Sequence, residues 1–269
     1  MDIPAARWHR AVNSRRSRRR FDKKPLTKSH VKHLEAVCAD FRLFESARAV
    51  LVTESPERVF KGAIGPYGKI RGAPAFIAFV GNTRSRIVQE QIGYMGEGIV
   101  LEAEALHVNT CWVSGTFRRD VTAALLSIDD TEAILAVTPV GYATPRLSFE
   151  EKLLTGFGRT HRRKPLSDLV IGLEQTEWPR WIRAALESAR LAPSAVNRQP
   201  WRFRVERDSI TVAVDSGKLK RESVQSKRLD CGIAMLHIEV AALHHGVRGS
   251  WRYFDPPLVA RFTAAGKAA

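Results

Sequence analysis

Two arginine-rich segments carry most of the net positive charge of the chain. Residues 1–24 hold nine Lys and Arg but only two Asp, and a second cluster, of Arg159, Arg162, Arg163 and Lys164, holds no acid. The two clusters supply 11 of the 15 net charges that 43 basic and 28 acidic residues leave. Because a planar guanidinium binds phosphate oxygens through two parallel hydrogen bonds, we expect these segments to bind an anion.

Alternation within the first cluster suggests how such a site is built. Arg15, Ser17 and Arg19 are two residues apart, so in an extended chain their side chains point to the same side. Arg163 would complete the clamp around a phosphate. Alone, the cluster is more typical of a solvated tail, and an arm that binds nucleic acid is a further alternative. An export signal would need an apolar segment directly downstream, and residues 25–30 are polar.

A second candidate binding segment is the loop at residues 192–201, which reads APSAVNRQPW. Pro, Ser and Asn are common wherever a helix ends or the chain turns, so these residue types alone predict only a loop. Ser194 and Asn197 also offer polar groups that can form hydrogen bonds with a ligand. Gln199 can do the same, or it can hold the loop in shape.

Four segments together resemble the FMN-dependent nitroreductase family. Residues 15–21 (RRSRRRF), followed by Pro25, resemble its R-R-S-x-R-x-F opening, and residues 192–201 resemble its A-P-S-x-x-N-x-Q-P-W loop. Residues 163–166 (RKPL) resemble its closing R-K-P-L segment, and residues 139–142 (PVGY) its flavin-contacting P-x-G-Y strand end. The matches span almost the whole chain, and the ten-residue loop is the most specific of them.

The resemblance implies a flavin site composed of residues from both halves of the chain. In the family, the basic arm, the P-x-G-Y segment and the terminal basic residues come from one subunit, and the A-P-S-x-x-N loop comes from the other. A backbone N–H near Gly141 would face the flavin N5. The residues that the resemblance assigns to FMN are Arg15, Arg16, Ser17, Arg19, Pro139, Gly141, Tyr142 and Arg163 in the first half, and Pro193, Ser194, Asn197 and Gln199 in the second.

The order of these segments departs from the family pattern. An ordinary member carries the loop soon after the arginine opening, whereas here residues 39–47 have a different sequence and the loop stands in the second half. The second half in turn has Trp178, Pro179 and Arg180 where an arginine opening would stand. We therefore expect one complete composite site and one lost site, as in a minority branch of the family in which both subunits are fused in one chain.

Internal similarity supports this expectation. At an offset of 139 residues, Gly93 aligns with Gly232, without a gap over 22 positions. Two similar halves would pack about a pseudo-twofold axis, as the subunits of a homodimer do. We predict an α+β, nitroreductase-like fold that is internally duplicated, so that one chain mimics the family homodimer. The first half would span residues 1–165 and the second, shorter half residues 166–269.

Hydrophobic periodicity predicts the elements that must position these segments. Apolar residues at helical spacing predict helices at 28–39, 91–107, 181–191 and 230–245. Apolar runs predict strands at 48–53, 73–80, 133–142, 201–206 and 210–214. The stretch 144–165, which contains Pro and Gly, predicts a loop between the halves.

The composition predicts an ordinary globular protein. Of the 269 residues, 44% are hydrophobic, and no apolar run approaches the roughly 18 residues of a membrane-spanning helix. We therefore expect a soluble protein without a membrane partner. Three widely spaced cysteines favour structural thiols in a reducing, cytoplasmic compartment. His237, His244 and His245 do not make a complete set of metal ligands, so no metal site is predicted.

The resemblance implies an FMN-dependent oxidoreductase. Electrons would pass from NADH or NADPH through the flavin N5 to a nitroaromatic, a quinone or a related acceptor, and no catalytic side chain is required. Two alternatives stay open: a non-catalytic flavin-binding or sensing protein, and a basic protein that associates with nucleic acid. We favour a monomer that forms its own pseudo-dimer, leave further oligomerisation open and disfavour a nucleic-acid partner. Arg18, Arg20, Lys23 and Lys24 are left without an assigned role.

Overall fold

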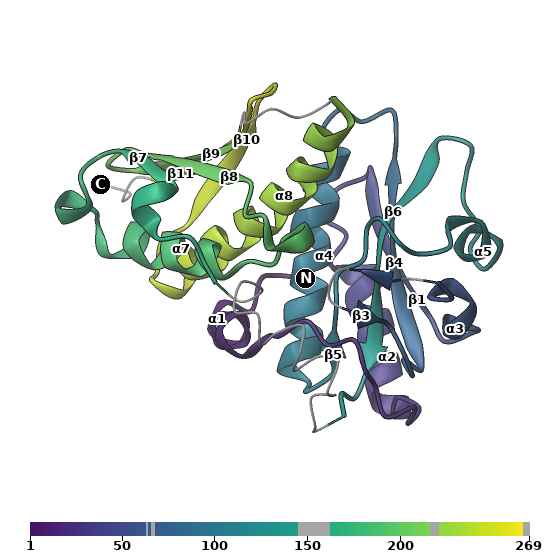
Figure 1. Ribbon diagram of the computed structural model, residues 1–269. Helices are drawn as coiled ribbons and strands as arrows, with labels where there is room; N and C mark the ends of the chain where they lie inside the picture. The colour runs from purple at the N-terminus through teal and green to yellow at the C-terminus, as the bar shows by residue number, and fades with distance from the viewer. Residues whose placement is uncertain (63, 66–67, 145–161, 216–220, 266–269) are drawn as a thin grey trace.

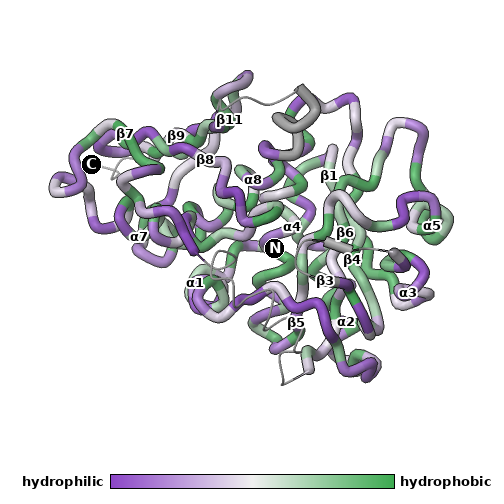
Figure 2. Tube along the Cα trace, viewed as in Figure 1, coloured by the Kyte–Doolittle hydropathy of each residue, from purple (hydrophilic) through white to green (hydrophobic). Residues whose placement is uncertain are grey.

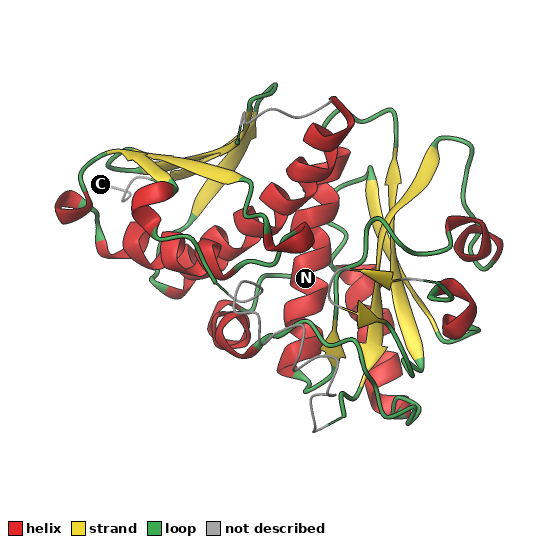
Figure 3. Cartoon of the chain, viewed as in Figure 1, coloured by secondary structure: helices red, strands yellow, loops and turns green. Residues whose placement is uncertain are grey.

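In the computed structural model, two β-sheets enclose a central layer of helices (Figure 1 and Figure 3). The structure describes residues 1–62, 64–65, 68–144, 162–215 and 221–265. Most of the predicted loop at 144–165, including Arg159, lies outside the described residues. Within these ranges, no helix combines the length and the apolar character that a membrane span requires.

The first sheet and its helices come from the N-terminal part of the chain. Their elements are α1 (Ala5–Ser14), α2 (Lys28–Asp40), β1 (Ala47–Val52), α3 (Pro56–Val59), β2 (Ile64–Gly65), β3 (Gly68–Lys69), β4 (Ala75–Asn82), α4 (Val88–Ala105), β5 (Asn109–Thr110), α5 (Arg119–Ala124) and β6 (Glu132–Gly141). The predicted helices and strands of this part are confirmed, and α1, α3, α5, β2, β3 and β5 are additions to them.

The second sheet and its helices follow. Their elements are η1 (Leu166–Asp168), β7 (Val170–Gly172), η2 (Gln175–Glu177), α7 (Arg180–Leu191), η3 (Ala195–Asn197), β8 (Trp201–Val205), β9 (Ser209–Val214), α8 (Arg221–His244), β10 (Gly249–Tyr253) and β11 (Leu258–Ala264). The predicted start of the last helix at residue 230 is wrong, because α8 begins at Arg221. Its first two turns consist largely of polar residues, which the apolar pattern did not include.

The two halves repeat one strand topology. The first sheet has the order β1-β4-β6-β5, and the second has the order β8-β9-β11-β10, so each sheet places its fourth strand between its second and third. Neighbouring strands in both sets are antiparallel. β7 extends the second sheet and runs parallel to β8. The repeat confirms the predicted α+β fold with internal duplication.

The long helices α4 and α8 cross at the centre of the molecule with their backbones in contact (Figure 1). A Cβ added at Gly93 would lie 2.0 Å from the carbonyl oxygen of Leu229, and one added at Gly232 would lie 2.1 Å from that of Glu90. The offset of 139 residues that relates the two glycines also relates Glu90 to Leu229. The two contacts are therefore exchanged by the pseudo-twofold axis, and glycine is required at both.

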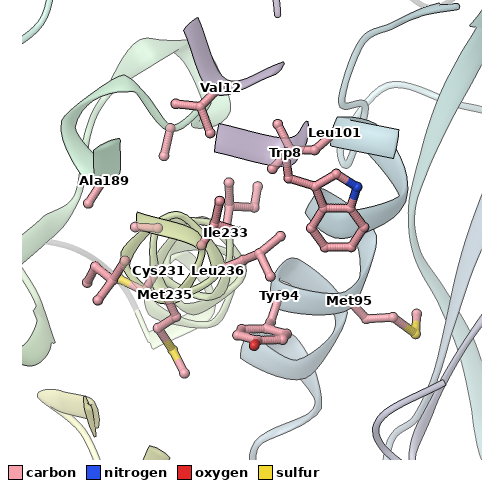
Figure 4. Close-up of a cluster of buried hydrophobic side chains, with 14 of the residues drawn as sticks. Trp8, Val12, Tyr94, Met95, Leu101, Ala189, Cys231, Ile233, Met235 and Leu236 are labelled. Atoms are coloured by element: carbon pink, nitrogen blue, oxygen red, sulfur yellow. The ribbon is translucent and has the colours of Figure 1, made fainter. Parts of the chain in front are cut away.

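The main hydrophobic core fills the space around this crossing. Trp8 and Val12 of α1, Met95 of α4, and Ile233 and Leu236 of α8 are at most 4% exposed, and the close-up in Figure 4 shows them gathered between the helices. Hydrophobic residues follow the strands and the central helices, whereas many peripheral loops are hydrophilic (Figure 2). The core thus joins the two halves rather than dividing into one core for each.

The first residues of the chain form a helix instead of extending the basic arm. Trp8, Ala11 and Val12 of α1 fall at helical spacing and are buried. Trp8 packs edge-on against Phe41, with 5.1 Å between the ring centroids. The solvated-tail alternative is therefore wrong for this helix, whose short apolar stripe is hidden in the sequence by the surrounding arginines. The basic arm begins at Arg15, where α1 ends.

Candidate anion-binding site between the two halves

An extended arm follows α1 and is attached to the edge of the first sheet. Ser17 pairs in parallel with Thr110 of β5, and the N–H of Arg18 donates to the Thr110 carbonyl oxygen at 2.8 Å. Further along, the N–H of Arg71 donates to the carbonyl oxygen of Arg19 at 2.8 Å. The extended backbone that the alternation of arginines required is therefore present, and side chains two residues apart share a side.

Arg15, at the start of this arm, is buried beside a carboxylate, but its Nε forms no hydrogen bond. Its exposed fraction is 6%, whereas the following Arg16 is exposed. The nearest carboxylate oxygen belongs to Glu97 and lies 3.7 Å from Arg15 Nε, which is too far for a hydrogen bond. Arg15 Nε has no hydrogen-bond partner among the described residues. A buried guanidinium in this state offers a free N–H to an anion.

Arg163 approaches the same place from the other basic cluster. Its terminal nitrogens donate to Asn197 Oδ1 and, at 3.1 Å, to the carbonyl oxygen of Leu191, while its Nε is buried without a partner in the described part of the chain. Burial, together with the positive charges of Arg15 and Arg16, lowers the pKa of Arg163 to about 10. Three arginines of the first half thus lie close enough to repel one another beside an asparagine of the second half.

The loop that carries Asn197 has a strained backbone. Val196, Asn197 and Gln199 have φ values of 49°, 54° and 51°, in the left-handed region that residues other than glycine rarely adopt. Each such residue costs on the order of 1–3 kcal/mol and persists only where its surroundings fix it. The Ser194 hydroxyl provides one such restraint, because it accepts the N–H of Gln199 at 3.0 Å. Strain of this kind is concentrated in functional loops.

Gln199 fastens the loop to the basic segment at residues 162–164. It is 3% exposed, its Oε1 accepts the N–H of Lys164 at 2.8 Å, and its Nε2 donates to the carbonyl oxygen of Arg162 at 3.1 Å. Asn197 Nδ2 donates to the same carbonyl oxygen at 3.0 Å. Of the two roles considered for Gln199, these bonds correspond to holding the loop. Pro193, which precedes the strained residues, is buried.

Asp230 of α8 forms hydrogen bonds with the loop. The sequence analysis did not identify this residue. Its carboxylate accepts the backbone N–H of Ala195 at 3.2 Å and the Nε–H of Arg198 at 2.8 Å. Burial raises the pKa of Asp230 to about 6, and the charge of Arg198 opposes this rise. An aspartate near the start of an apolar run was the available signal, since a buried acid needs partners.

The strand-end residues of the P-x-G-Y segment lie at the other end of the arm. Pro139 and Gly141 belong to β6, and a Cβ added at Gly141 would lie 2.6 Å from Pro74 and 3.0 Å from Phe21. Gly141 is thus needed where the arm packs on the sheet. Ser17 of the arm pairs with Thr110, which pairs in turn with Val140, so a single strand separates the start of the arm from the P-x-G-Y segment.

Tyr142 joins the arm to the start of α2. Its hydroxyl accepts the N–H of Thr27 at 3.3 Å and lies 2.9 Å from Nδ1 of His30, and its carbonyl oxygen accepts the N–H of Asp22 at 3.0 Å. A cavity of about 630 Å³ opens at this end of the arm, between α3 and the start of β4. Its lining includes Lys23 and Arg71, so positive charge continues beyond the arginine cluster.

Three fully buried carboxylates on α4 were also missed by sequence reasoning. Each lies beside a cation from another element: Glu90 beside Arg228, Glu97 beside Arg15, and Glu102 beside Arg7. The available signal was the occurrence of acids within an otherwise apolar helix, because a buried carboxylate requires a cation or hydrogen-bond donors. The carboxylates of α4 therefore compensate the positive charge of the arginines that pack against this helix.

Comparison with known proteins identifies the architecture. The model of the family described as putative TM nitroreductase matches residues 8–242. A crystal structure of a putative nitroreductase from Thermotoga maritima is 19% identical in sequence, with a TM-score of 0.65 over 95% of this chain and 93% of that chain. The similarity over nearly the full length of both chains establishes the nitroreductase-like fold. The comparison with curated proteins gives no match.

Two further crystal structures are similar to part of this chain. A nitroreductase family protein from Streptococcus pneumoniae is 15% identical and covers 61% of this chain and 98% of its own, with a TM-score of 0.46. An FMN-dependent nitroreductase from Clostridium difficile is 13% identical and covers 51% of this chain and 88% of its own, with a TM-score of 0.42.

Proposed function

We propose, for a chain that belongs to the putative TM nitroreductase family, that its two halves bind one FMN between them and that it is an FMN-dependent oxidoreductase. The arginine cluster would bind the phosphate of FMN. NADH or NADPH would donate electrons, and a nitroaromatic, a quinone or a related compound would accept them. The observation that supports this proposal is the convergence of the buried Arg15 and the half-buried Arg163 beside a loop of the other half, where both have a buried Nε–H without a hydrogen-bond partner among the described residues.

The residues of the cluster fit a phosphate monoester. The buried Nε–H groups of Arg15 and Arg163 lack partners among the described residues, and an unsatisfied buried donor costs about 1–3 kcal/mol. A dianionic phosphate would accept both bonds and offset the repulsion that lowers the pKa of Arg163. Arg16 would add charge at the solvent-facing side, and Ser17 would add a hydroxyl donor.

When bound, FMN supplies the two-electron chemistry of the reaction. The chain would bind and orient it: Arg15 and Arg163 at the phosphate, with Asn197 aligning Arg163 through its side-chain oxygen. Ser194 and Gln199 would keep the strained loop in place through their hydrogen bonds. The arm from Arg19 to the strand end at Gly141 would offer the surface along which the rest of the cofactor lies. No side chain is proposed for proton transfer.

The binding test compares FMN with riboflavin, which lacks the phosphate. Arg15→Ala should weaken FMN binding roughly 10- to 100-fold, as expected for a hydrogen bond to a charged group, and should leave riboflavin affinity within about twofold. Asn197→Ala should also weaken FMN binding, although it lies in the other half. The measurement is quenching of flavin fluorescence on titration with protein. Unchanged FMN affinity in either variant refutes the composite site.

Two control variants make the same changes of charge and residue type away from the proposed site. Arg118→Ala removes an exposed arginine that pairs with Asp120, and Asn13→Ala removes an exposed asparagine at the end of α1. Both should bind FMN as the unmodified protein does. If these variants also lose affinity, the effect of Arg15→Ala reflects net charge or stability and not a contact with phosphate.

The enzyme proposal is tested by adding NADH or NADPH to the FMN-loaded protein without oxygen. Loss of the oxidised flavin absorbance with either donor, and its return on addition of a quinone, supports an oxidoreductase. FMN that stays oxidised with both donors leaves a flavin-binding protein and refutes the enzyme. A colourless protein that does not bind FMN but is retained on DNA in a salt-sensitive manner supports the nucleic-acid alternative.

A further inference from the structure

The cavity at the end of the arm is separate from the residues assigned to FMN. Its volume of about 630 Å³ is typical of a small-molecule site. Its lining comes from three segments: the arm at Lys23, residues 53–62 around α3, and residues 69–74 before β4. None of the residues that the resemblance assigns to FMN is among the described residues that line it. The proposed function therefore leaves this cavity without a ligand.

Positive charge predominates in the lining of the cavity. Four cationic side chains line it, all of them exposed: Lys23, Lys61, Lys69 and Arg71. Glu57 is the only acid among the described residues of the lining. Within the described part of the chain, the side chains of the four cations form no ion pair or hydrogen bond. The excess positive charge is therefore available to an anion.

The same cavity has an apolar surface. Phe60 is 5% exposed and packs edge-on against Phe76, with 6.1 Å between the ring centroids, and Pro56 is also buried. Phe60 and Phe76 belong to one core cluster, so close packing fixes the surface that Phe60 offers. Ile70 and Pro74 extend the apolar part of the lining. A ligand that fits this cavity therefore combines an apolar body with a negative charge.

Close packing holds the end of the arm against the cavity wall. Gly72 has a φ of 76°, and a Cβ added there would lie 2.5 Å from the carbonyl oxygen of Phe21 and 3.2 Å from Cγ of Lys23. The N–H of Phe21 donates to the carbonyl oxygen of Arg71 at 2.9 Å. Lys23 itself has a φ of 64°, in the left-handed region that residues other than glycine rarely adopt. Lys23 is thus fixed beside the segment that carries Lys69 and Arg71.

We propose that this cavity binds a small organic anion, with its carboxylate or phosphate group at the lysines and its apolar body against Phe60. A lysine ammonium is a compact charge on a flexible stem, so it attracts either kind of group. Lys61 follows Phe60 directly in the chain, which places charge and apolar surface side by side. The site does not depend on FMN, and it gives a role to Lys23, which the sequence analysis left unassigned.

The first experiment compares three probes that share one ring system. The anions are 2-naphthoate and 2-naphthyl phosphate, and the uncharged probe is 2-naphthalenemethanol. In calorimetric titrations at low ionic strength, at least one anion should bind with a Kd about tenfold below that of the alcohol, as several exposed ion pairs together would give. The tighter anion shows whether the site prefers a carboxylate or a phosphate. Equal affinity for all three probes overturns the inference.

Lys23→Gln and Lys61→Gln each remove one charge and keep most of the length of the side chain. Each should weaken binding of the anion about twofold to fivefold, as expected for an exposed ion pair, and leave the affinity for the alcohol unchanged. Lys32→Gln is the matched control, because Lys32 is an exposed lysine of α2 that does not line the cavity. Anion binding that Arg15→Ala weakens and the two lysine variants do not would place the anion at the arginine cluster and overturn the inference.

Backbone ¹H–¹⁵N NMR spectra of the unmodified protein locate the probe without relying on a variant. Ring currents of the bound naphthalene should shift the signals of Lys61 and Gly72. Shifts confined to Ala195 and Asn197 would place the probe at the loop between the halves and overturn the inference. Binding at the cavity in a protein that does not bind FMN supports the inference and refutes the proposed function. FMN binding without binding at the cavity does the reverse.

Discussion

Asp230 places a carboxylate in the interior, where it links the strained loop to α8. Burial raises the pKa of Asp230 from 3.8 to about 6, against the opposing charge of Arg198. Between these two pH values the folded chain binds more protons at this residue than the unfolded chain does. The contribution of Asp230 to stability is therefore fully present below about pH 4 and is lost as the pH rises to 6.

We predict that Asp230→Asn removes this component of the pH dependence. In the unmodified protein, Asp230 should lower the free energy of unfolding by roughly 2 kcal/mol between pH 4 and pH 6. Urea unfolding of both proteins at several pH values in this window measures the difference. Asp208→Asn, at an exposed aspartate, is the control and should retain the dependence. Parallel curves for Asp230→Asn and the unmodified protein would contradict the prediction.

For single residues, the sequence pointed to the side chains proposed to bind the anion, but not to the buried acids that lie behind them. The residue types and spacing of Arg15, Arg163 and Asn197 singled them out, and the structure brings them together. Glu97 and Asp230 could not be identified in this way. Whether an acid is buried depends on the cation or donor that packs against it, and those partners come from distant parts of the chain.

Among the elements, the crossing of α4 and α8 depends on glycine. We predict that Gly93→Ala and Gly232→Ala each lower the free energy of unfolding by about 3 kcal/mol, because the new Cβ would overlap a backbone carbonyl that cannot rotate away. The loss should occur although alanine favours helices by about 1 kcal/mol over glycine. Urea unfolding gives the values, and the pseudo-twofold relation predicts similar effects for the two variants.

Gly115→Ala is the control for this pair. No atom lies within 4 Å of a Cβ added there, so the variant should change stability by less than about 0.5 kcal/mol. If Gly93→Ala is as stable as Gly115→Ala, the helices can separate without cost and the crossing does not hold the halves together.

Hydrophobic periodicity predicted the elements in which most residues are buried, such as α4 and β4. It missed α1, where only three residues are buried, and it missed β10, where exposed and partly buried residues alternate. These elements are stabilised by what they pack against, so the local pattern alone is weak. β7 has only three residues, and its pairing with β8 joins segments that the sequence separates by a helix.

For the whole molecule, the proposed function predicts one FMN for each chain. Phe41 caps the C-terminal end of α2, and Ala192 caps that of α7, which has the corresponding place before the first antiparallel strand of the second sheet. Both residues are fully buried, and a loop follows each of them. The loop after Phe41 contains none of the residues that the resemblance assigns to FMN. Titration monitored by calorimetry should give a ratio of one, and a ratio of two would contradict the prediction.

The resemblance in sequence predicted this asymmetry, since the arm occurs only in the first half and the loop only in the second. The way in which the halves share one core could not be predicted. Burial of Trp8, Ile233 and Leu236 in a single cluster results from packing between residues at opposite ends of the chain. The hydrophobic pattern within one segment does not show which distant segment it contacts.

The packing of α1 against α8 has a consequence for the order in which the protein can be made. α1 leaves the ribosome well before α8, whose Ile233 and Leu236 share a core with Trp8. Until α8 has been made, the nascent chain can pack α1 only against the elements that precede α8, so part of its apolar surface stays exposed. This core should therefore form only after α8 has emerged, and until then the exposed surface is prone to aggregation.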